Sequence, residues 1–268
     1  MGNCGVWVRQ LWRLLVLAGS IGVAQAQPQV APQIHLATNQ DWYPYSGVKD
    51  GKSVGLAVDI VRQAFAAVGV TAIIEPMPQL RCLGEVERGL LMGCFSIGRQ
   101  NPLIVNGKVI THKTPLFVAA PVVFAASDSD LQVRDVEDMR GRRIALTKDA
   151  HYGDDVELVM RETRVDAMNE LAALRMLVRG RVELTMGDPR SMGYLIHAHP
   201  EEFAGRFKIV SRAEGTTNIL AQLAFSKKRP EAQRYADLLD EGLAIIKASG
   251  EYARIDARWS FQLKPAKR

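Results

Sequence analysis

Residues 79–99 of the chain read QLRCLGEVERGLLMGCFSIGR, and residues 169–190 read NELAALRMLVRGRVELTMGDPR. Both stretches have the pattern of a short amphipathic helix that ends in Arg-Gly, followed by a short apolar strand and a polar tip. A glycine directly behind a basic last turn is typical of a helix C-terminus. The pattern therefore predicts two helix–strand units, one ending near Arg99 and the other at Asp188.

Strands and helices also alternate before the first of these units. Residues 34–37 have the pattern of a strand, residues 55–68 carry apolar side chains at helical spacing, and residues 71–74 form a second apolar run. This alternation predicts a parallel α/β sheet. Because ligands bind outside the carboxyl ends of the strands in such sheets, two units predict two α/β lobes whose polar tips face a shared cleft.

Two extended apolar segments, near residues 117–121 and 216–222, bracket a middle block. The block has the size of a small domain. We therefore predict a discontinuous arrangement with two crossing strands as the hinge. The first lobe comprises residues 27–120 and 217–268, and the second lobe comprises residues 121–216.

The N-terminus has the pattern of a secretory signal peptide. Arg9 and Arg13 precede an apolar run at residues 14–23, and Ala24-Gln25-Ala26 is a small-x-small site. An apolar run of roughly ten residues is too short to span a bilayer. We predict cleavage after Ala26 and export to the periplasm, with an uncleaved membrane anchor as the alternative.

The charge of the chain is mildly basic. The formal net charge of +5 falls to +3 when the two arginines of the predicted signal peptide are removed. The basic residues are scattered and do not form the clustered stripe of a nucleic-acid binder. We therefore expect no nucleic-acid partner.

Two cysteines, Cys82 and Cys94, remain in the predicted mature chain. An oxidising compartment permits a disulfide, which requires Cα atoms within about 7 Å of each other. The alternative is two small, buried apolar side chains. Two cysteines without matched histidines predict no metal site.

The mature chain resembles the bacterial extracellular solute-binding proteins of family 3, the periplasmic components of polar amino-acid ABC transporters. The matching segments follow in order along most of the chain: DWYPYSG (41–47), GKSVGLAVDIVRQAFAAVGV (51–70), GRRIALTKDAHYGDD (141–155), ALRMLVRGRVELTMGD (173–188) and GLAIIKASGEYARIDARW (242–259). The resemblance implies a type II periplasmic binding fold, with two α/β lobes that close on a small solute. It also implies a partner permease in the inner membrane, and we expect a monomer without a cofactor.

The resemblance suggests residues for the two charged ends of an amino acid. Asp188 matches the ammonium-binding aspartate of the family, with a helix N-cap before Pro189 as the alternative. Ser96 matches a threonine of the family, and Arg99 is the candidate for the arginine that binds the ligand carboxylate. Arg99 comes earlier than in the family pattern, so the alternative is that the family arginine is absent. Arg81 is a second candidate for the carboxylate. A surface charge is the alternative for either arginine.

Aromatic residues provide the remaining candidates. Trp42, Tyr43 and Tyr45 match the aromatic turn that lines the family's pocket, where rings stack on a side chain or hold a cation. Packing between the lobes is the alternative. Tyr152 lies in a loop that departs from the usual Gly-Thr/Ser stretch but resembles one branch of the family.

The sequence contains no nucleophile elbow, Walker loop, dinucleotide fingerprint or zinc-binding helix. We therefore expect a binding protein rather than an enzyme, one that captures a small polar solute and delivers it to a permease. Two alternatives stay open. One is an enzyme on the same scaffold, similar to the cyclohexadienyl dehydratases, and the other is a ligand-sensing protein for a separate membrane partner.

Overall fold

The computed structural model describes residues 1, 31–98, 101–148, 150, 152–211, 218–261 and 263. It divides the chain into two compact units, Met1–Ala31 and Pro32–Arg268. Apart from Met1, the predicted signal peptide lies outside the described residues. None of the helices in the described ranges is long and apolar enough to cross a membrane.

The first sheet has six strands in the order β5-β1-β6-β14-β7, with β8 paired to β14. Its strands are β1 (Gln33–Asn39), β5 (Thr71–Met77), β6 (Gly93–Gly98), β7 (Val109–Thr111), β8 (Phe117–Ala119) and β14 (Ile219–Ser226). β1 is parallel to β5 and β6, whereas β14 is antiparallel to β6, β7 and β8. The prediction of a parallel sheet is therefore wrong for half of this sheet. A parallel neighbour requires a crossover connection, usually a helix, between the two strands. β14 joins the first sheet as an extended segment and not through such a helix, and it pairs antiparallel with its neighbours.

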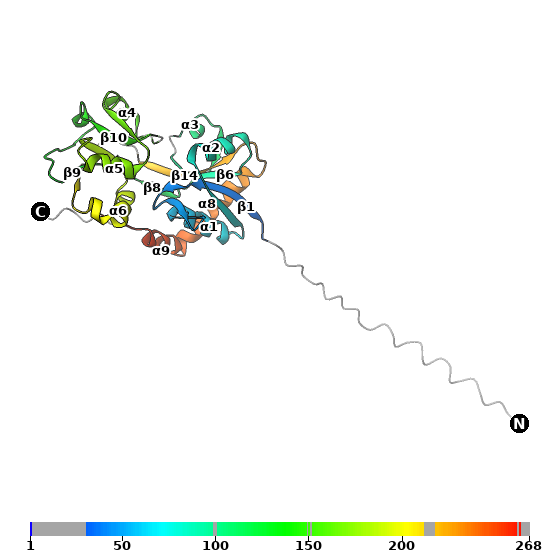
Figure 1. Cartoon of the computed structure of the whole chain (residues 1–268). Helices are drawn as coiled ribbons and strands as arrows, with labels where there is room; N and C mark the ends of the chain where they lie inside the picture. The colour runs from blue at the N-terminus through cyan, green and yellow to red at the C-terminus, as the bar shows by residue number, and fades with distance from the viewer. Residues whose placement is uncertain are drawn as a thin grey trace. The chain divides into compact units, whose positions relative to one another are not determined.

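The second sheet has five strands in the order β11-β10-β12-β9-β13. Its strands are β9 (Val122–Ala126), β10 (Ile144–Thr147), β11 (Arg164–Ala167), β12 (Leu184–Gly187) and β13 (Phe207–Ser211). β10 is parallel to β11 and β12, but β9 is antiparallel to β12 and β13. This sheet is therefore mixed as well. Figure 1 shows β9 and β10 of this sheet near helices α4 and α5.

A small antiparallel hairpin follows β1. It consists of β2 (Asp41–Trp42), β3 (Ser46–Lys49) and β4 (Lys52–Val54). Asp50 and Gly51 join β3 to β4 with φ angles of 52° and 72°. Two consecutive positive φ angles are typical of a type I′ hairpin turn.

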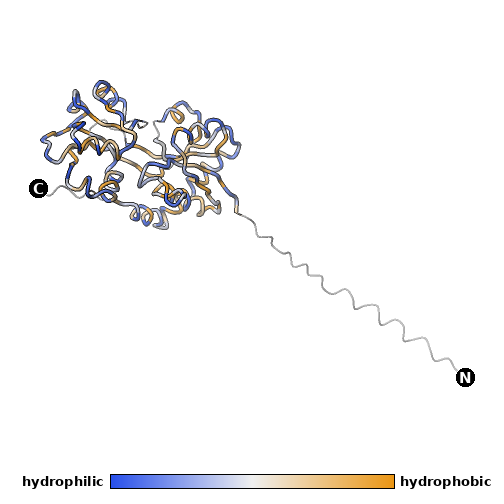
Figure 2. The backbone as a smooth tube through the Cα atoms, in the orientation of Figure 1, coloured by the Kyte–Doolittle hydropathy of each residue, from blue (hydrophilic) through white to orange (hydrophobic). Residues whose placement is uncertain are grey.

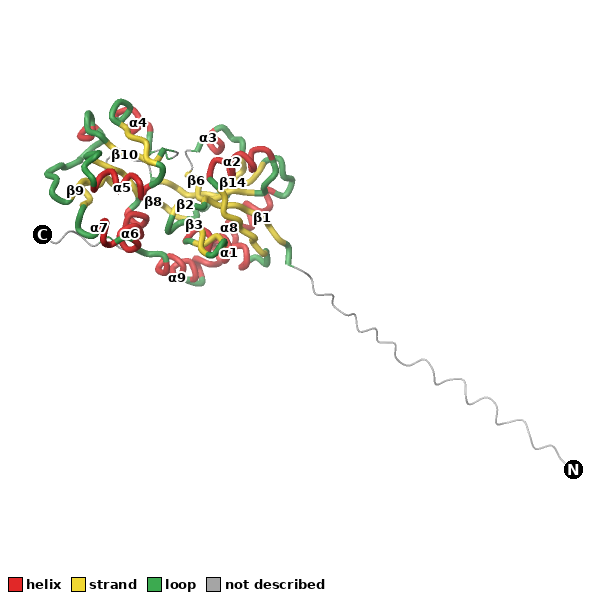
Figure 3. Tube along the Cα trace, in the orientation of Figure 1, coloured by secondary structure: helices red, strands yellow, loops and turns green. Residues whose placement is uncertain are grey.

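Helices cover both faces of each sheet (Figure 3). Those next to the first sheet are α1 (Leu56–Ala67), α2 (Gln79–Arg88), α3 (Pro102–Val105), α8 (Ala232–Ala248) and α9 (Glu251–Arg258). Those next to the second sheet are α4 (Asp154–Val159), α5 (Glu170–Val178), α6 (Pro189–Ala198), α7 (Pro200–Phe203) and the 3₁₀ helix η1 (Glu137–Met139). Helix α8 begins at Ala232, shortly after a turn in which Arg229 N donates to Ser226 O.

The two predicted helix–strand units are confirmed. Helix α2 ends at Arg88, with Gly89 in the left-handed conformation at φ 81°, and β6 follows. Helix α5 ends at Val178, Gly180 has a φ of 68°, and β12 follows. In both units, a residue without a side chain stops the helix where the chain must turn back toward the sheet.

Apolar side chains form separate clusters on the two sheets. Figure 2 colours the backbone by the hydropathy of each residue. On the first sheet, Leu36 packs with α1 and α8, whereas its neighbour Ala37 packs with α2 on the opposite face. On the second sheet, Leu146 packs on the side of α4 and Ala145 on the side of α5. Because both faces are covered, consecutive residues are buried at positions 36–38 of β1 and 144–146 of β10 rather than every second one.

Three segments connect the elements of the two sheets. β8 leads from the first sheet into β9, and β14 lies antiparallel to β8, with Ile219 opposite Ala119. The C-terminal segment is the third connection. Two of its described residues contact the second sheet's elements: Phe261 lies against Tyr194 of α6, and Leu263 packs on an apolar cluster of the second sheet. The lobe boundaries at residues 120 and 216 stay a prediction.

Candidate functional site

Asp188 follows the carboxyl end of β12 and starts helix α6. Its Oδ1 atom accepts a hydrogen bond from the backbone N–H of Arg190 at 2.9 Å, which is an N-cap. Pro189 at the first helical position has no N–H to satisfy and suits this start. The capping role considered for Asp188 is therefore present.

Asp188 also binds elements that belong to the first sheet. Tyr45 Oη donates to Oδ1 at 2.5 Å, and Ala120 N donates to Oδ2 at 2.9 Å. Asp188 is only 6% exposed. The hairpin, the segment between β8 and β9, and helix α6 thus meet at one buried carboxylate.

The Tyr45 ring is fixed by aromatic packing. It stacks on Phe117 with centroids 4.2 Å apart and lies 4.7 Å from the Trp42 ring. The guanidinium carbon of Arg190 lies 5.9 Å from the centroid of the Tyr45 ring. Burial, and then the negative charge of Asp188, raise the pKa of Tyr45. The hydroxyl therefore stays protonated and donates to Asp188.

Tyr43 makes a second contact between the hairpin and α6. Its ring stacks on Tyr194, with centroids 5.1 Å apart and planes at 10°. The Tyr43 hydroxyl donates to Val48 O at 2.6 Å. A Cβ atom at Gly47 would lie 2.1 Å from Tyr43 Cε2, so this position must be glycine for the ring to lie there. The three predicted aromatic residues therefore lie together, and Tyr43 and Tyr45 both contact residues of α6.

Glu170 is a residue of this site that the sequence analysis missed. It is the first residue of α5, directly after the N-cap Asn169. Burial raises the pKa of Glu170 to about 8, a shift that the charges of Asp188 and Asp41 reinforce and that a hydrogen bond with the Ser191 side chain opposes. A glutamate behind an asparagine N-cap looks like an ordinary first-turn acid, so the sequence carries no signal for this environment.

A third carboxylate belongs to the same cluster. Asp41 Oδ2 accepts a hydrogen bond from Asn169 Nδ2 at 3.2 Å, which connects the hairpin to the start of α5. Within the described ranges, no Lys, Arg or His forms an ion pair with Asp41, Glu170 or Asp188. The electrostatic environment beside these three carboxyl groups therefore favours a positively charged group.

Tyr152 is buried in the apolar cluster of the second sheet. Its hydroxyl accepts a hydrogen bond from Thr147 N at 3.3 Å. Burial, together with the carboxyl of Glu170, raises the pKa of Tyr152 to about 12. This hydroxyl holds the end of β10 next to Glu170, and direct contact between Tyr152 and a ligand stays a prediction.

The residues predicted for the ligand carboxylate are less well defined. Arg81 is exposed and forms a surface ion pair with Glu85 one turn along α2, at 2.8 Å. Ser96 lies in β6. Arg99 lies outside the described residues. Ligand binding by these three stays a prediction.

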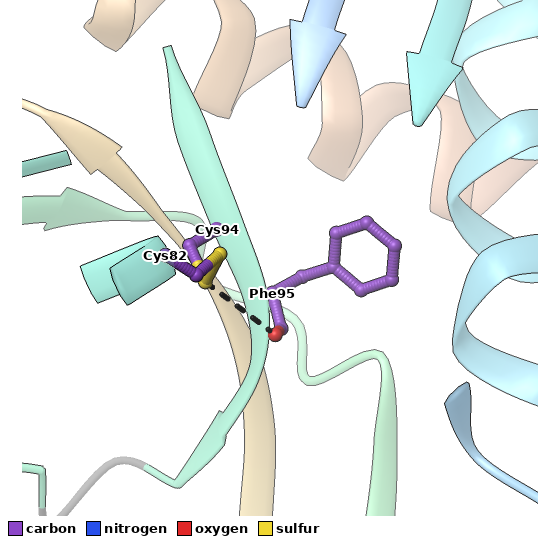
Figure 4. The surroundings of a disulfide bond; sticks show 3 residues. All are labelled: Cys82, Cys94 and Phe95. Atoms are coloured by element: carbon purple, nitrogen blue, oxygen red, sulfur yellow. Dashed lines mark hydrogen bonds between the residues drawn. A yellow bond between two sulfur atoms is a disulfide. The ribbon is translucent and has the colours of Figure 1, made fainter. Parts of the chain in front are cut away.

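Cys82 and Cys94 are joined by a disulfide with an S–S distance of 2.05 Å and Cα atoms 5.9 Å apart (Figure 4). Both residues are fully buried. The bond connects the first turn of α2 to β6, within the first helix–strand unit. It therefore fixes the helix against the strand whose end carries Ser96.

One group of potential metal ligands lies elsewhere, on the surface near α7. The ligand atoms of His199, Glu201 and Glu202 lie within 4.8 Å of one another. Glu202, however, accepts two hydrogen bonds from Arg175 at 2.6 and 2.7 Å. This arrangement is an ion-pair network, and the absence of a metal site stays a prediction.

Solved structures share this fold. A histidine kinase sensor domain with similarity to periplasmic binding proteins matches with a TM-score of 0.72 and 22% identity, over 88% of this chain and 99% of that one. The arginine-, lysine-, histidine-binding protein of the thermophilic bacterium Geobacillus stearothermophilus matches with a TM-score of 0.70 and 16% identity, over 85% and 94%. An ancestral arginine-binding protein bound to glutamine matches with a TM-score of 0.68 and 18% identity, over 85% and 97%.

A comparison with curated protein sequences gives no match. The family model of the bacterial extracellular solute-binding proteins, family 3, matches residues 34–262, which include both sheets, the hairpin and the C-terminal helices. The match confirms the two-lobed α/β fold class and the solute-binding role expected from the sequence. The chain belongs to the bacterial extracellular solute-binding proteins of family 3.

Proposed function

We propose that this protein is a periplasmic receptor for a small polar solute with a cationic nitrogen, an amino acid or a related amine. The receptor delivers the solute to an ABC transporter permease in the inner membrane. The observation that carries the proposal is the buried carboxylate of Asp188, with Glu170 and Asp41 beside it. Family membership and the predicted signal peptide support the periplasmic setting.

Charge supports a cationic solute. Removing a carboxylate from water is unfavourable unless it is paired, and an unpaired carboxyl responds by taking up a proton. The raised pKa of Glu170 is that response. A positive group on the solute supplies the missing partner and also contacts Asp188.

The aromatic side chains support the same class of solute. Trp42, Tyr43 and Tyr45 gather at the hairpin beside Asp188. Ring faces attract ammonium and guanidinium groups within about 6 Å of the centroid. Carboxylates together with aromatic faces therefore favour an amine over a simple carboxylic acid.

A thermal-shift panel tests the solute class. The predicted mature chain is mixed with amino acids, polyamines and dicarboxylic acids, and a solute at 100 times its Kd adds about 2.7 kcal/mol to the free energy of unfolding. We expect amines or cationic amino acids to raise the melting temperature. Stabilisation by dicarboxylic acids alone would contradict the proposal.

Substitution of Asp188 tests the site. Asp188→Asn keeps an N-capping side chain but removes the charge, so binding of the amine found in the panel should be lost while the circular dichroism spectrum is unchanged. Asp135→Asn is the control, because Asp135 Oδ1 also accepts a hydrogen bond from a backbone N–H two residues ahead, Glu137 N at 2.9 Å, but lies away from the site. Equal affinity in the wild type and Asp188→Asn contradicts the assignment.

Delivery is tested by uptake. Cells without this protein should take up the labelled solute more slowly, and the wild-type gene should restore the rate. If uptake does not change while the solute alters association with another membrane protein, the receptor serves a sensor and not a permease.

The second candidate function is that of an enzyme, and the raised pKa of Glu170 is the observation that favours it. A carboxyl with a pKa near 8 suits proton transfer at neutral pH. If the protein is a dehydratase, NMR of a mixture with cyclic hydroxy acids will show product formation that stops in Glu170→Gln. Binding without turnover favours the receptor.

A further inference from the structure

We propose that Tyr45 sets the ligand specificity of this site, because its hydroxyl competes with the cationic group of the solute for the Asp188 carboxylate. The inference rests on the proposed function, in which Asp188 contacts that cationic group. Tyr45 then selects the ligand through its hydroxyl, in addition to lining the site with its aromatic ring.

The Asp188 carboxylate has little remaining capacity for hydrogen bonds. A carboxylate has about four lone-pair sites. Oδ1 accepts from Tyr45 Oη at 2.5 Å and from Arg190 N at 2.9 Å, and Oδ2 accepts from Ala120 N at 2.9 Å. Of the three donors, only Tyr45 offers a side chain, so only this donor can be removed by substitution without changing the backbone.

The Tyr45 hydroxyl cannot turn away from Asp188 by a simple rotamer change. Tyr45 is 2% exposed, and its ring packs against both Phe117 and Trp42, which also contact each other. The main chain is fixed as well, since Tyr45 O accepts from Ala57 N in α1 at 2.9 Å. The hydroxyl is therefore a permanent neighbour of Oδ1.

A donor in this position weakens the attraction of Asp188 for a further cation. Hydrogen bonds to a carboxylate stabilise its negative charge, so each one reduces what an incoming ammonium group gains. The Tyr45 hydroxyl therefore weakens binding of solutes whose ammonium group must contact Asp188 Oδ1. It does not affect solutes that bind without a cationic nitrogen.

The test is Tyr45→Phe, which removes one oxygen atom and keeps the packed ring. Calorimetric titrations use L-arginine, L-lysine, L-glutamine and putrescine as probes, with glutarate as the comparator that lacks a cationic nitrogen. We expect the Kd of a bound ammonium probe to fall about tenfold, which corresponds to about 1.4 kcal/mol. Glutarate should show no change.

Tyr252→Phe is the matched control. Tyr252 also uses its hydroxyl for one hydrogen bond, to Leu116 O at 2.8 Å, but has no bond to Asp188. It should leave the Kd of every probe unchanged. In the Asp188→Asn background, Tyr45→Phe should not restore binding of the ammonium probe, because the charge for which the two groups compete is gone.

The outcomes separate this inference from the proposed function. If the wild type binds an ammonium probe and Tyr45→Phe binds it equally or more weakly, the inference is overturned and the proposed function stands. If only Tyr45→Phe binds ammonium probes, the inference is supported in its strongest form. If neither protein binds any of the four probes, the proposed function fails and the inference fails with it.

Discussion

Cys82 in α2 and Cys94 in β6 are 12 residues apart in the sequence and are joined by a buried disulfide. The bond restricts the unfolded chain and stabilises the folded state by about 3 kcal/mol for a loop of this length. Replacement of both cysteines by alanine should lower the free energy of unfolding by about this amount. Urea denaturation of the predicted mature chain measures the difference.

A reductant provides the control for this prediction. The reductant should lower the urea midpoint of the wild type, because unfolding exposes the disulfide to reduction. It should leave the urea midpoint of the double alanine variant unchanged. Equal midpoints for the oxidised wild type and the variant would show that the bond adds no stability.

Two helical glycines should respond in opposite ways to replacement by alanine. A Cβ atom at Gly242 of α8 would lie 2.0 Å from Ala64 O in α1, whereas a Cβ atom at Gly84 of α2 would lie 3.5 Å from its nearest neighbour, the end of the Arg88 side chain. Gly242→Ala should therefore destabilise the fold by about 1–3 kcal/mol through overpacking. Gly84→Ala should stabilise it by about 0.5–1 kcal/mol, because alanine loses less backbone entropy in a helix.

Thermal unfolding of the two glycine variants provides the measurement. The melting temperature should fall for Gly242→Ala and rise for Gly84→Ala. A rise for both would mean that α1 and α8 do not approach as closely as the structure places them.

Glu170 should make stability depend on pH. Its pKa in the folded state is about 8, above the ordinary value of 4.5. Between these two values, the folded state keeps a proton that the unfolded state loses, so the contribution of Glu170 to stability is present at low pH and falls as the pH rises through this window. Above pH 8, both states have lost the proton and the dependence ends.

The variant Glu170→Gln isolates this contribution. It cannot ionise, so the free energy of unfolding should fall less steeply than that of the wild type across the same window. Urea unfolding at intervals of pH measures both curves. Parallel curves would show that Glu170 titrates normally in the folded protein.

Binding of a cationic solute should release a proton from the same residue. A positive group beside Glu170 favours its ionised form and lowers its pKa, so at neutral pH the complex holds less of this proton than the free protein. Calorimetric titrations in two buffers with different ionisation enthalpies measure the number of protons released. The release should disappear in Glu170→Gln, and a binding heat that is independent of the buffer in the wild type contradicts the coupling.

The helix–strand units were predictable because their signals are local. The periodicity of apolar residues and the glycines at positions 89 and 180 determine where α2 and α5 end, whatever the rest of the chain does. The turn at Asp50 and Gly51 is local in the same way. The direction of β14 is different, because it depends on which strands the segment meets after crossing from the second sheet.

The candidate site shows the same division. The aromatic turn and Asp188 were found because their residue types and positions match a family pattern. Glu170 was not, because its raised pKa arises from burial and from Asp188 and Asp41, which are distant in the sequence. The bond between Tyr45 and Asp188 spans 143 residues and was equally invisible.

The sequence by itself determined the family, the helix–strand units and the identity of the central carboxylate, because these depend on residue type and local spacing. Only the tertiary structure decided the mixed pairing of both sheets and the partners of Asp188. Hydrogen bonding and desolvation act between atoms that are close in space. Whether Asp188 is shared with Tyr45, and whether Glu170 holds a proton, therefore follows from packing and not from the order of residues.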